Sequence, residues 1–120
     1  MLFRSIRQRY AMVEKARQAS NFGIIISTKP GQSNPTIALN IQHQLEENGK
    51  KAVLLYADEI RPEKLLDFTD VDAFVDTACP RLALDDPERF QKPIVTRDEI
   101  MVVMGAWTWE QLLERGLVRL

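Results

Sequence analysis

Apolar residues follow two different spacings along the chain, and the two alternate. In residues 1–20 they recur every three or four positions with charged residues between them, which is typical of an amphipathic helix. This apolar stripe consists of Phe3, Ile6, Tyr10 and Val13. The next segment, GIIIS at 23–27, is short, β-branched and continuously apolar, as in a strand buried on both faces of a parallel sheet. The chain is therefore predicted to open with a helix that ends near Asn21 and leads into a buried strand.

The same alternation continues to the end of the chain. The further predicted strands are 52–57, interpreted as a second buried strand, 71–76 and 93–95. The helices between and after them are marked by Asn34-Pro35 with a stop at Gly49, by Pro62, and by the capping boxes Thr96–Glu99 and Thr108–Gln111. This order predicts one α/β domain over residues 1–120. We expect a three-layer sandwich in which a small, mainly parallel four-stranded sheet is flanked by helices.

Composition and charge narrow the class of protein. With 120 residues, 45% of them hydrophobic and 28% charged, the chain fits one soluble domain. A net charge of −1 argues against non-specific nucleic-acid binding, and Arg4, Arg7 and Arg9 are interpreted as a solvated helix face. No apolar run approaches the roughly 18 residues of a membrane span. A single cysteine excludes an internal disulfide and fits a reducing compartment, so we expect a cytoplasmic protein with no membrane or nucleic-acid partner.

Two loops leave predicted strand ends with unusual polar content. Ligands of parallel α/β sheets bind beyond the carboxyl ends of the strands, so both loops are predicted to lie on the same ligand-binding edge. The first loop, STKPGQSN, precedes a helix N-terminus, and its lysine and backbone N–H groups suit an anion. It lacks the spacing of a phosphate-binding P-loop, and Pro30 removes one N–H group. A plain strand-to-helix turn with a good cap explains it equally well.

The second loop, DTACPR, contains the only cysteine of the chain, Cys79. Pro80 favours extended backbone at Cys79, and Arg81 has a charge that can lower a thiol pKa or hold a carboxylate. Cys-Pro also ends some iron–sulfur motifs, although the dipeptide alone is weak. A lone cysteine is more often a small buried hydrophobic residue. A cysteine protease is disfavoured, because the only histidine, His43, lies in the middle of a predicted helix and is expected at the surface.

Four segments together resemble a known family. They are RYAMVEKARQASNFGIIISTKPGQSNPTIAL, GKKAVLLYADEIRPEKLLDF, VDAFVDTACPRLALDD and FQKPIVTRDEIMVVMG. In this order they resemble the C-terminal domain of archaeal-type diphthamide synthase, the 2-(3-amino-3-carboxypropyl)histidine synthase family. The resemblance covers about residues 9–105, and STKPGQ and TACPR are specific only as a pair. The family often has asparagine where this chain has Asp76.

The resemblance implies a fold, an activity and a set of site residues. Members of this type have three similar α/β domains, each of which gives one cysteine to a [4Fe–4S] cluster that binds S-adenosylmethionine. They move a 3-amino-3-carboxypropyl group onto a histidine of elongation factor 2 by radical chemistry. By this resemblance Cys79 is the cluster ligand of the third domain. The residues implied to line the neighbouring cofactor pocket are Ser27, Thr28, Lys29, Gly31, Gln32 and Arg81.

The length of the chain departs from that family pattern. Two of the three domains, and so two of the three cluster cysteines, are missing from these 120 residues. The chain alone is therefore expected to be inactive and to need sister domains or subunits as partners. One alternative is a non-catalytic, stand-alone paralogue that acts as a binding or regulatory module. Another is a small anion- or nucleotide-binding domain that uses STKPGQSN.

Overall fold

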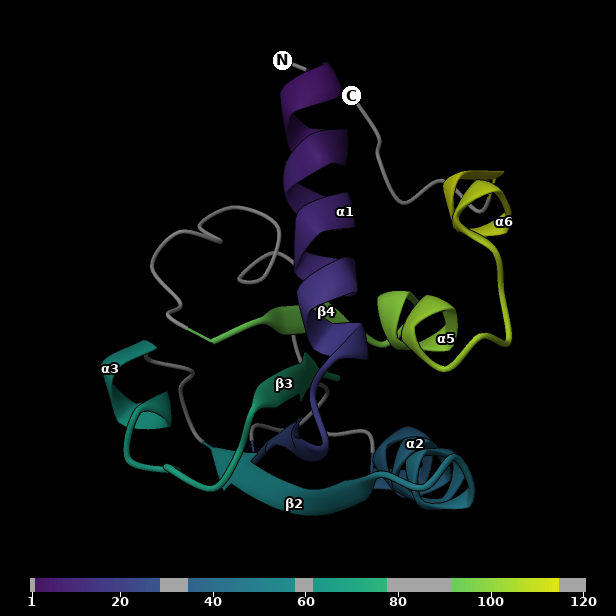
Figure 1. Ribbon diagram of the computed structural model, residues 1–120. Helices are drawn as coiled ribbons and strands as arrows, with labels where there is room; N and C mark the ends of the chain where they lie inside the picture. The colour runs from purple at the N-terminus through teal and green to yellow at the C-terminus, as the bar shows by residue number, and fades with distance from the viewer. Residues whose placement is uncertain (1, 29–34, 58–61, 78–91, 115–120) are drawn as a thin grey trace.

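The computed structural model describes residues 2–28, 35–57, 62–77 and 92–114 (Figure 1). Four parallel strands form one sheet in the order β2-β1-β3-β4. The strands are β1 (Asn21–Ser27), β2 (Lys51–Ala57), β3 (Ala73–Asp76) and β4 (Ile94–Thr96). The helices are α1 (Leu2–Arg17), α2 (Pro35–Glu47), α3 (Pro62–Leu65), α5 (Glu99–Val103) and α6 (Trp109–Glu114). The predicted element order is confirmed, and the sheet that was predicted to be mainly parallel has parallel pairing between all four described strands.

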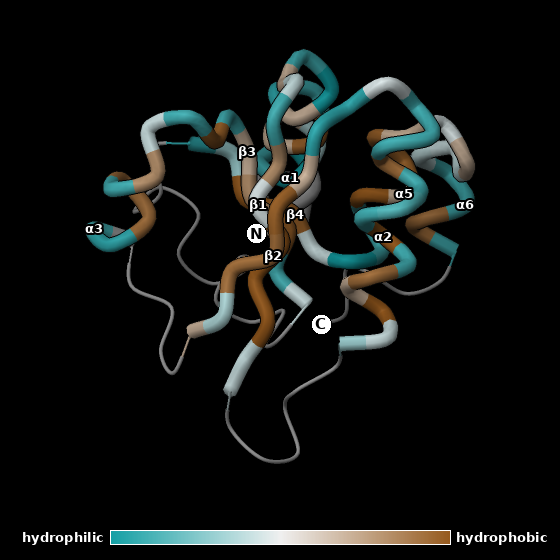
Figure 2. Tube along the Cα trace, turned by 90° about the horizontal axis from the view of Figure 1, so that it is seen from below, coloured by the Kyte–Doolittle hydropathy of each residue, from teal (hydrophilic) through white to brown (hydrophobic). Residues whose placement is uncertain are grey.

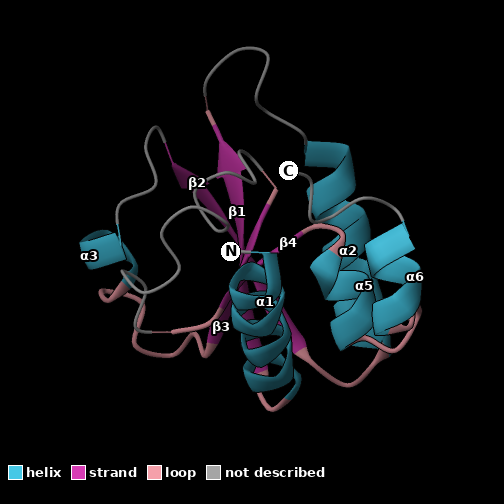
Figure 3. Ribbon diagram, turned by 90° about the horizontal axis from the view of Figure 1, so that it is seen from above, coloured by secondary structure: helices cyan, strands magenta, loops and turns pink. Residues whose placement is uncertain are grey.

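The sheet separates two hydrophobic clusters. Side chains alternate between the faces of a strand, so Ile24 and Ile26 of β1 point to one face and Ile25 points to the other. The larger cluster contains Ile24 and Ile26 and is covered by α1, α2, α5 and α6. The smaller cluster contains Ile25 and is covered by Leu65 of α3. Figure 3 shows α2, α5 and α6 on one side of the strands and α3 on the other, and Figure 2 shows the strands between them as the most hydrophobic part of the chain. The predicted α/β fold, a small sheet flanked by helices, is confirmed.

The helix ends follow the predicted signals in most places. Both capping boxes form: the Thr96 hydroxyl accepts from the Glu99 N–H at 3.1 Å, and the Thr108 hydroxyl accepts from the Gln111 N–H at 3.1 Å. The first helix is shorter than predicted and ends at Arg17. The reason is that Asn21 already belongs to β1, where its backbone N–H donates to the Asp72 carboxylate at 3.1 Å. None of the helices that the structure describes is long and apolar enough to cross a membrane.

The prediction of a strand buried on both faces is wrong for 52–57, which belong to β2 at one edge of the sheet. Val53 is 49% exposed and Tyr56 is 63% exposed. Consecutive apolar residues indicate a strand in a parallel sheet, but they do not indicate whether that strand lies in the centre or at the edge. β1, which pairs with β2 on one side and β3 on the other, is buried on both faces, and so are β3 and β4.

Gly23 occupies a closely packed position of β1, the strand between β2 and β3. A Cβ atom at this position would lie 2.8 Å from Cδ1 of Leu55 and 3.2 Å from Cδ1 of Phe74. We expect Gly23→Ala to lower the free energy of unfolding by about 1–3 kcal/mol, the usual effect of overpacking a core. Urea denaturation would measure it, with Glu46→Ala at an exposed position of α2 as the control. Equal stability of Gly23→Ala and the parent chain would contradict this close packing.

Candidate ligand site at the carboxyl edge of the sheet

The carboxyl ends of the parallel strands meet at one edge of the sheet. Asp76 of β3 pairs in register with Ile25 of β1 on one side and with Thr96 of β4 on the other. β1 continues two residues beyond Ile25 to Ser27, which pairs with Ala57 of β2. The polar residues that end three neighbouring strands are therefore brought side by side. This is the edge at which parallel α/β sheets bind ligands.

Backbone hydrogen bonds fix where the two candidate loops leave the sheet. The Thr28 N–H donates to the Ala57 carbonyl at 3.0 Å, which extends the β1–β2 pairing one residue past β1. The Thr77 N–H donates to the Ile25 carbonyl at 3.2 Å, and the Thr77 hydroxyl donates to the same oxygen at 2.6 Å. Both loops therefore start from anchored positions on adjacent strands.

The polar side chains at this edge differ in their access to solvent. Thr28 is exposed, whereas the other polar residues at the strand ends are almost fully buried. These are Ser27, Asp76, Thr77 and Thr96, each at most 5% exposed. A buried polar group is retained where hydrogen bonds or charges compensate its lost hydration. Asp76 at the end of β3 is 1% exposed and so lies within the protein.

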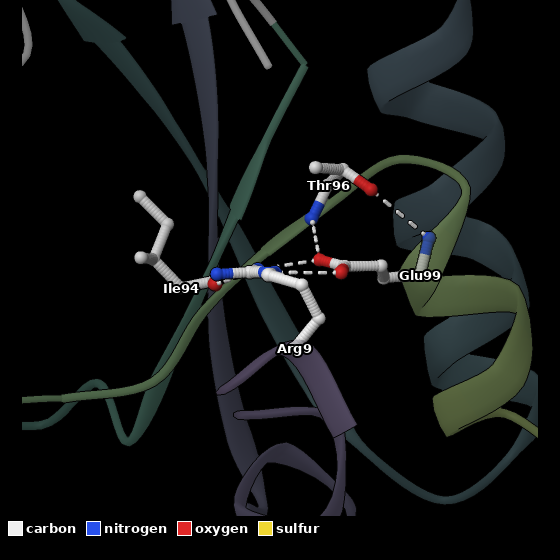
Figure 4. Close-up of polar contacts among 4 residues, drawn as sticks. All are labelled: Arg9, Ile94, Thr96 and Glu99. Carbon is white, nitrogen blue, oxygen red and sulfur yellow. Dashed lines mark hydrogen bonds and ion pairs between the residues drawn. The ribbon is translucent and has the colours of Figure 1, made fainter. Parts of the chain in front are cut away.

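A buried ion pair supports this edge from the side of α1 (Figure 4). Arg9 donates from Nε to Oε2 of Glu99 at 2.8 Å and from Nη2 to Oε1 at 2.6 Å. Its Nη2 also donates to the Ile94 carbonyl at 2.9 Å, and Oε1 of Glu99 accepts from the Thr96 N–H at 2.9 Å. Arg9 is 2% exposed and Glu99 is fully buried. The pair therefore joins α1, the end of β4 and the start of α5 in one hydrogen-bonded unit.

The prediction that Arg9 belongs to a solvated basic face is wrong. Arg7 is exposed as predicted, but Arg9 faces the core. The sequence spacing already indicated that Arg9 is buried. Arg9 precedes Val13 by four residues and Ala16 by seven, so it lies on the same face of the helix. Both Val13 and Ala16 are buried. A charge on a buried stripe predicts a buried partner, and Glu99 supplies it.

The structure places only part of the predicted site. Ser27 and Thr28 lie at the carboxyl edge, as expected. The remaining predicted site residues lie outside the described residues: Lys29, Gly31, Gln32, Cys79 and Arg81. The last described residue before the cysteine loop is Thr77 at the end of β3, on the strand next to Ser27 and Thr28. In the described ranges, no group of three or more His, Cys, Asp or Glu side chains is arranged to hold a metal ion.

Other sequence-based expectations concern residues away from this edge. His43 is exposed on α2, as predicted, and its Nε2 lies 3.1 Å from Oε1 of Glu47. Trp107 and Trp109, at the start of the last helix, pack against the larger hydrophobic cluster. The ring of Trp109 also stacks edge-on against Tyr10 of α1, with centroids 5.4 Å apart.

Comparison with known sequences shows that the chain is similar to members of one protein family. Residues 2–113 match the family model described as "Putative diphthamide synthesis protein". The chain is 37% identical over 102 residues to the 2-(3-amino-3-carboxypropyl)histidine synthase of Pyrococcus horikoshii, covering 85% of this chain and 30% of that protein. It is 36% identical over 104 residues to subunit 1 of the corresponding synthase of Schizosaccharomyces pombe, covering 87% of this chain and 24% of that subunit. The chain thus spans about a quarter to a third of the length of these relatives.

The fold agrees with a solved structure of the same kind. The crystal structure of Dph2 from Pyrococcus horikoshii with a 4Fe-4S cluster matches this chain with a TM-score of 0.82 and 35% sequence identity. The match covers 88% of this chain and 30% of that chain. The similarity therefore extends over nearly the whole domain described above and over one part of a larger protein.

Proposed function

The chain belongs to the diphthamide synthesis protein family, and from this membership we propose that it is a cluster-binding domain of a 3-amino-3-carboxypropyl transferase. One observation carries the proposal. The domain matches part of a relative described with a 4Fe-4S cluster, its only cysteine comes shortly after β3 in the sequence, and β3 ends at the edge where such folds bind ligands. In this proposal Cys79 supplies one thiolate to the cluster.

The number of cysteines in this chain fits a cluster whose ligands come from several domains or subunits, rather than a cluster held by this chain alone. Protein-bound [4Fe–4S] clusters are held mainly by several cysteine thiolates, and this chain has one cysteine. The other thiolates must then come from sister domains or from other subunits. The chain covers 30% of the Pyrococcus horikoshii protein, a share that suits one domain of three, and we assign it to the third.

The residues beside the proposed cluster are assigned to the cofactor S-adenosylmethionine. We assign Ser27, Thr28, Lys29, Gly31 and Gln32 to its pocket, because STKPGQ follows β1, the strand next to β3. Arg81, with a planar guanidinium that binds carboxylates in a bidentate manner, is assigned to the carboxylate of that cofactor.

The cluster and the protein substrate complete the proposed role. When bound, the cluster supplies the electron that starts cleavage of a C–S bond of S-adenosylmethionine. The acceptor is a histidine of elongation factor 2, and the sister domains supply the rest of the site. The cytoplasmic location predicted from the single cysteine belongs to the same proposal.

A chimaeric synthase tests this role. The segment of the Pyrococcus horikoshii synthase that aligns with this chain over 102 residues is replaced by this chain's own segment. We expect anaerobic reconstitution with iron and sulfide to give a [4Fe–4S] absorption. With S-adenosylmethionine, elongation factor 2 and a one-electron reductant such as dithionite to reduce the cluster, we also expect release of 5′-methylthioadenosine, which remains when the aminocarboxypropyl group leaves S-adenosylmethionine. The synthase that lacks the segment is the control, and it should do neither.

Two results would separate the parts of the proposal. A folded chimaera that binds a cluster but releases no methylthioadenosine would contradict the transferase role and leave the ligand role of Cys79. A folded chimaera that binds no cluster would contradict both. That second result would favour the alternative of a non-catalytic binding or regulatory module.

A further inference from the structure

A buried carboxylate ends β3 at the carboxyl edge of the sheet (Figure 1). Asp76 is the last residue of β3 and is 1% exposed. Its in-register neighbours are Ile25 of β1 and Thr96 of β4, so the residue lies between two strands. Among the described residues, Glu99 is the only other buried carboxylate, and its partner Arg9 lies 2.6 Å away. That ion pair explains Glu99, whereas Asp76 needs a separate explanation.

The position of Asp76 would suit an apolar residue if only the fold mattered. Residues 73–75, which precede it in β3, are all apolar and buried. Side chains alternate along a strand, so Asp76 shares its face with Phe74, a member of the smaller hydrophobic cluster. Burying a carboxylate beside such a residue costs free energy that an apolar side chain would not cost. A buried charge of this kind at a ligand-binding edge is typical of functional sites.

Asp76 lies close in the sequence to Cys79, the proposed cluster ligand, since only two residues separate them. Three residues of extended chain span at most about 11 Å, so the covalent chain keeps the two Cα atoms within roughly that distance. Thr77 fixes the start of this connection, because its N–H and its hydroxyl donate to the Ile25 carbonyl at 3.2 Å and 2.6 Å. A charge on Asp76 is therefore held near any cluster that Cys79 binds.

We propose that the Asp76 carboxylate lowers the reduction potential of the cluster that Cys79 is proposed to bind. This role of Asp76 rests on the proposed ligand role of Cys79. Reduction adds one electron and makes the cluster more negative, so a nearby anion disfavours the reduced form. The electron itself comes from the external reductant. By lowering the potential, Asp76 makes the reduced site a stronger donor of the electron that starts cleavage of the C–S bond.

Burial of the carboxylate makes this effect large enough to measure. The repulsion between two unit charges about 10 Å apart, at an effective dielectric constant of about 20, shifts an equilibrium on the order of tenfold. The same charge on an exposed side chain would be largely screened by salt over this distance, whereas buried charges are screened much less. For a one-electron couple, a tenfold shift corresponds to a change of about 59 mV in reduction potential.

A redox titration of the reconstituted chimaeric synthase tests the proposal, with the reduced cluster followed by electron paramagnetic resonance. At one fixed solution potential, Asp76→Asn should give about tenfold more reduced relative to oxidised cluster than the parent chimaera. The comparison isolates this charge from others in the same segment, such as Arg81. Asp76→Glu keeps the charge and should stay close to the parent. Asp70→Asn removes an exposed carboxylate before the start of β3 and is the matched control, with no expected change.

Iron and sulfide content of the same samples separates this role of Asp76 from the proposed function. A parent chimaera without a cluster would contradict the proposed function. Full clusters with equal potentials in the parent and Asp76→Asn would overturn only the role of Asp76. A folded Asp76→Asn chimaera without its cluster would overturn it too, since Asp76 would then be needed to hold the cluster. Asp76→Ser, with a smaller side chain, carries the same expectation and replaces Asp76→Asn if that variant does not fold.

Discussion

Arg9→Met is expected to lower the free energy of unfolding by roughly 3–5 kcal/mol, the usual loss when one partner of a buried ion pair is removed. The substitution keeps an apolar stem in place but leaves the fully buried Glu99 carboxylate without its guanidinium. Glu99→Gln should have an effect of similar size for the opposite reason. Its amide oxygen can still accept the Thr96 N–H, so the variant separates charge loss from loss of the capping box. Urea denaturation followed by circular dichroism would measure both.

Two further variants make the test specific. Arg7→Met changes an exposed arginine on the same helix and should alter stability by less than about 0.5 kcal/mol. The double variant Arg9→Met with Glu99→Gln removes both buried charges and should recover much of the stability lost by each single change. Purely additive losses in the double variant would show that the two side chains do not act as a pair.

The pattern of apolar and polar residues was sufficient to predict the architecture, because the spacing of apolar residues reflects which faces of a helix or strand are buried. Ile24, Ile25 and Ile26 are apolar on consecutive positions because β1 is covered on both faces, and all three are at most 1% exposed. The capping boxes were equally direct, since two side chains and two backbone groups three residues apart define them. Local chemistry therefore predicted the elements and their ends.

Features that depend on contacts between residues far apart in the sequence could not be predicted from local sequence patterns. The burial of Arg9 depends on Glu99, which lies 90 residues further along the chain. The edge position of β2 depends on the sheet order, which skips from β2 back to β1 before β3. The pattern KAVLLYA is compatible with either a central or an edge strand. Partner choice and sheet order, rather than local preference, explain both differences.

The candidate site was predicted in part for the same reasons. Because ligands bind beyond the carboxyl ends of parallel strands, Ser27 and Thr28 were predicted to lie at that edge of the sheet, and the structure has them there. It did not single out Thr77, whose hydroxyl and N–H both bond to the Ile25 carbonyl and so anchor the start of the cysteine loop. A threonine directly after a buried strand, before a polar loop, is the only sequence signal for that anchor.

Cys79→Ala in the chimaeric synthase is expected to have the largest effect of all on function. Alanine keeps a small apolar side chain but has no thiolate, so the cluster would lose one of its ligands. We expect cluster retention to fall by more than about tenfold, the scale seen even for outer partners of metal ligands. Asp86→Ala changes a neighbouring residue of the same sequence segment and serves as the matched control. Thermal unfolding of both variants would show whether they fold equally well.

The central claim is tested most directly by the iron and acid-labile sulfide bound per chimaera after anaerobic reconstitution, compared between Cys79→Ala and Asp86→Ala. We expect the Asp86→Ala chimaera to hold a full [4Fe–4S] complement and the Cys79→Ala chimaera, folded to the same extent, to hold little of it. Equal iron and sulfide content in the two folded proteins would contradict the assignment of Cys79 as a cluster ligand.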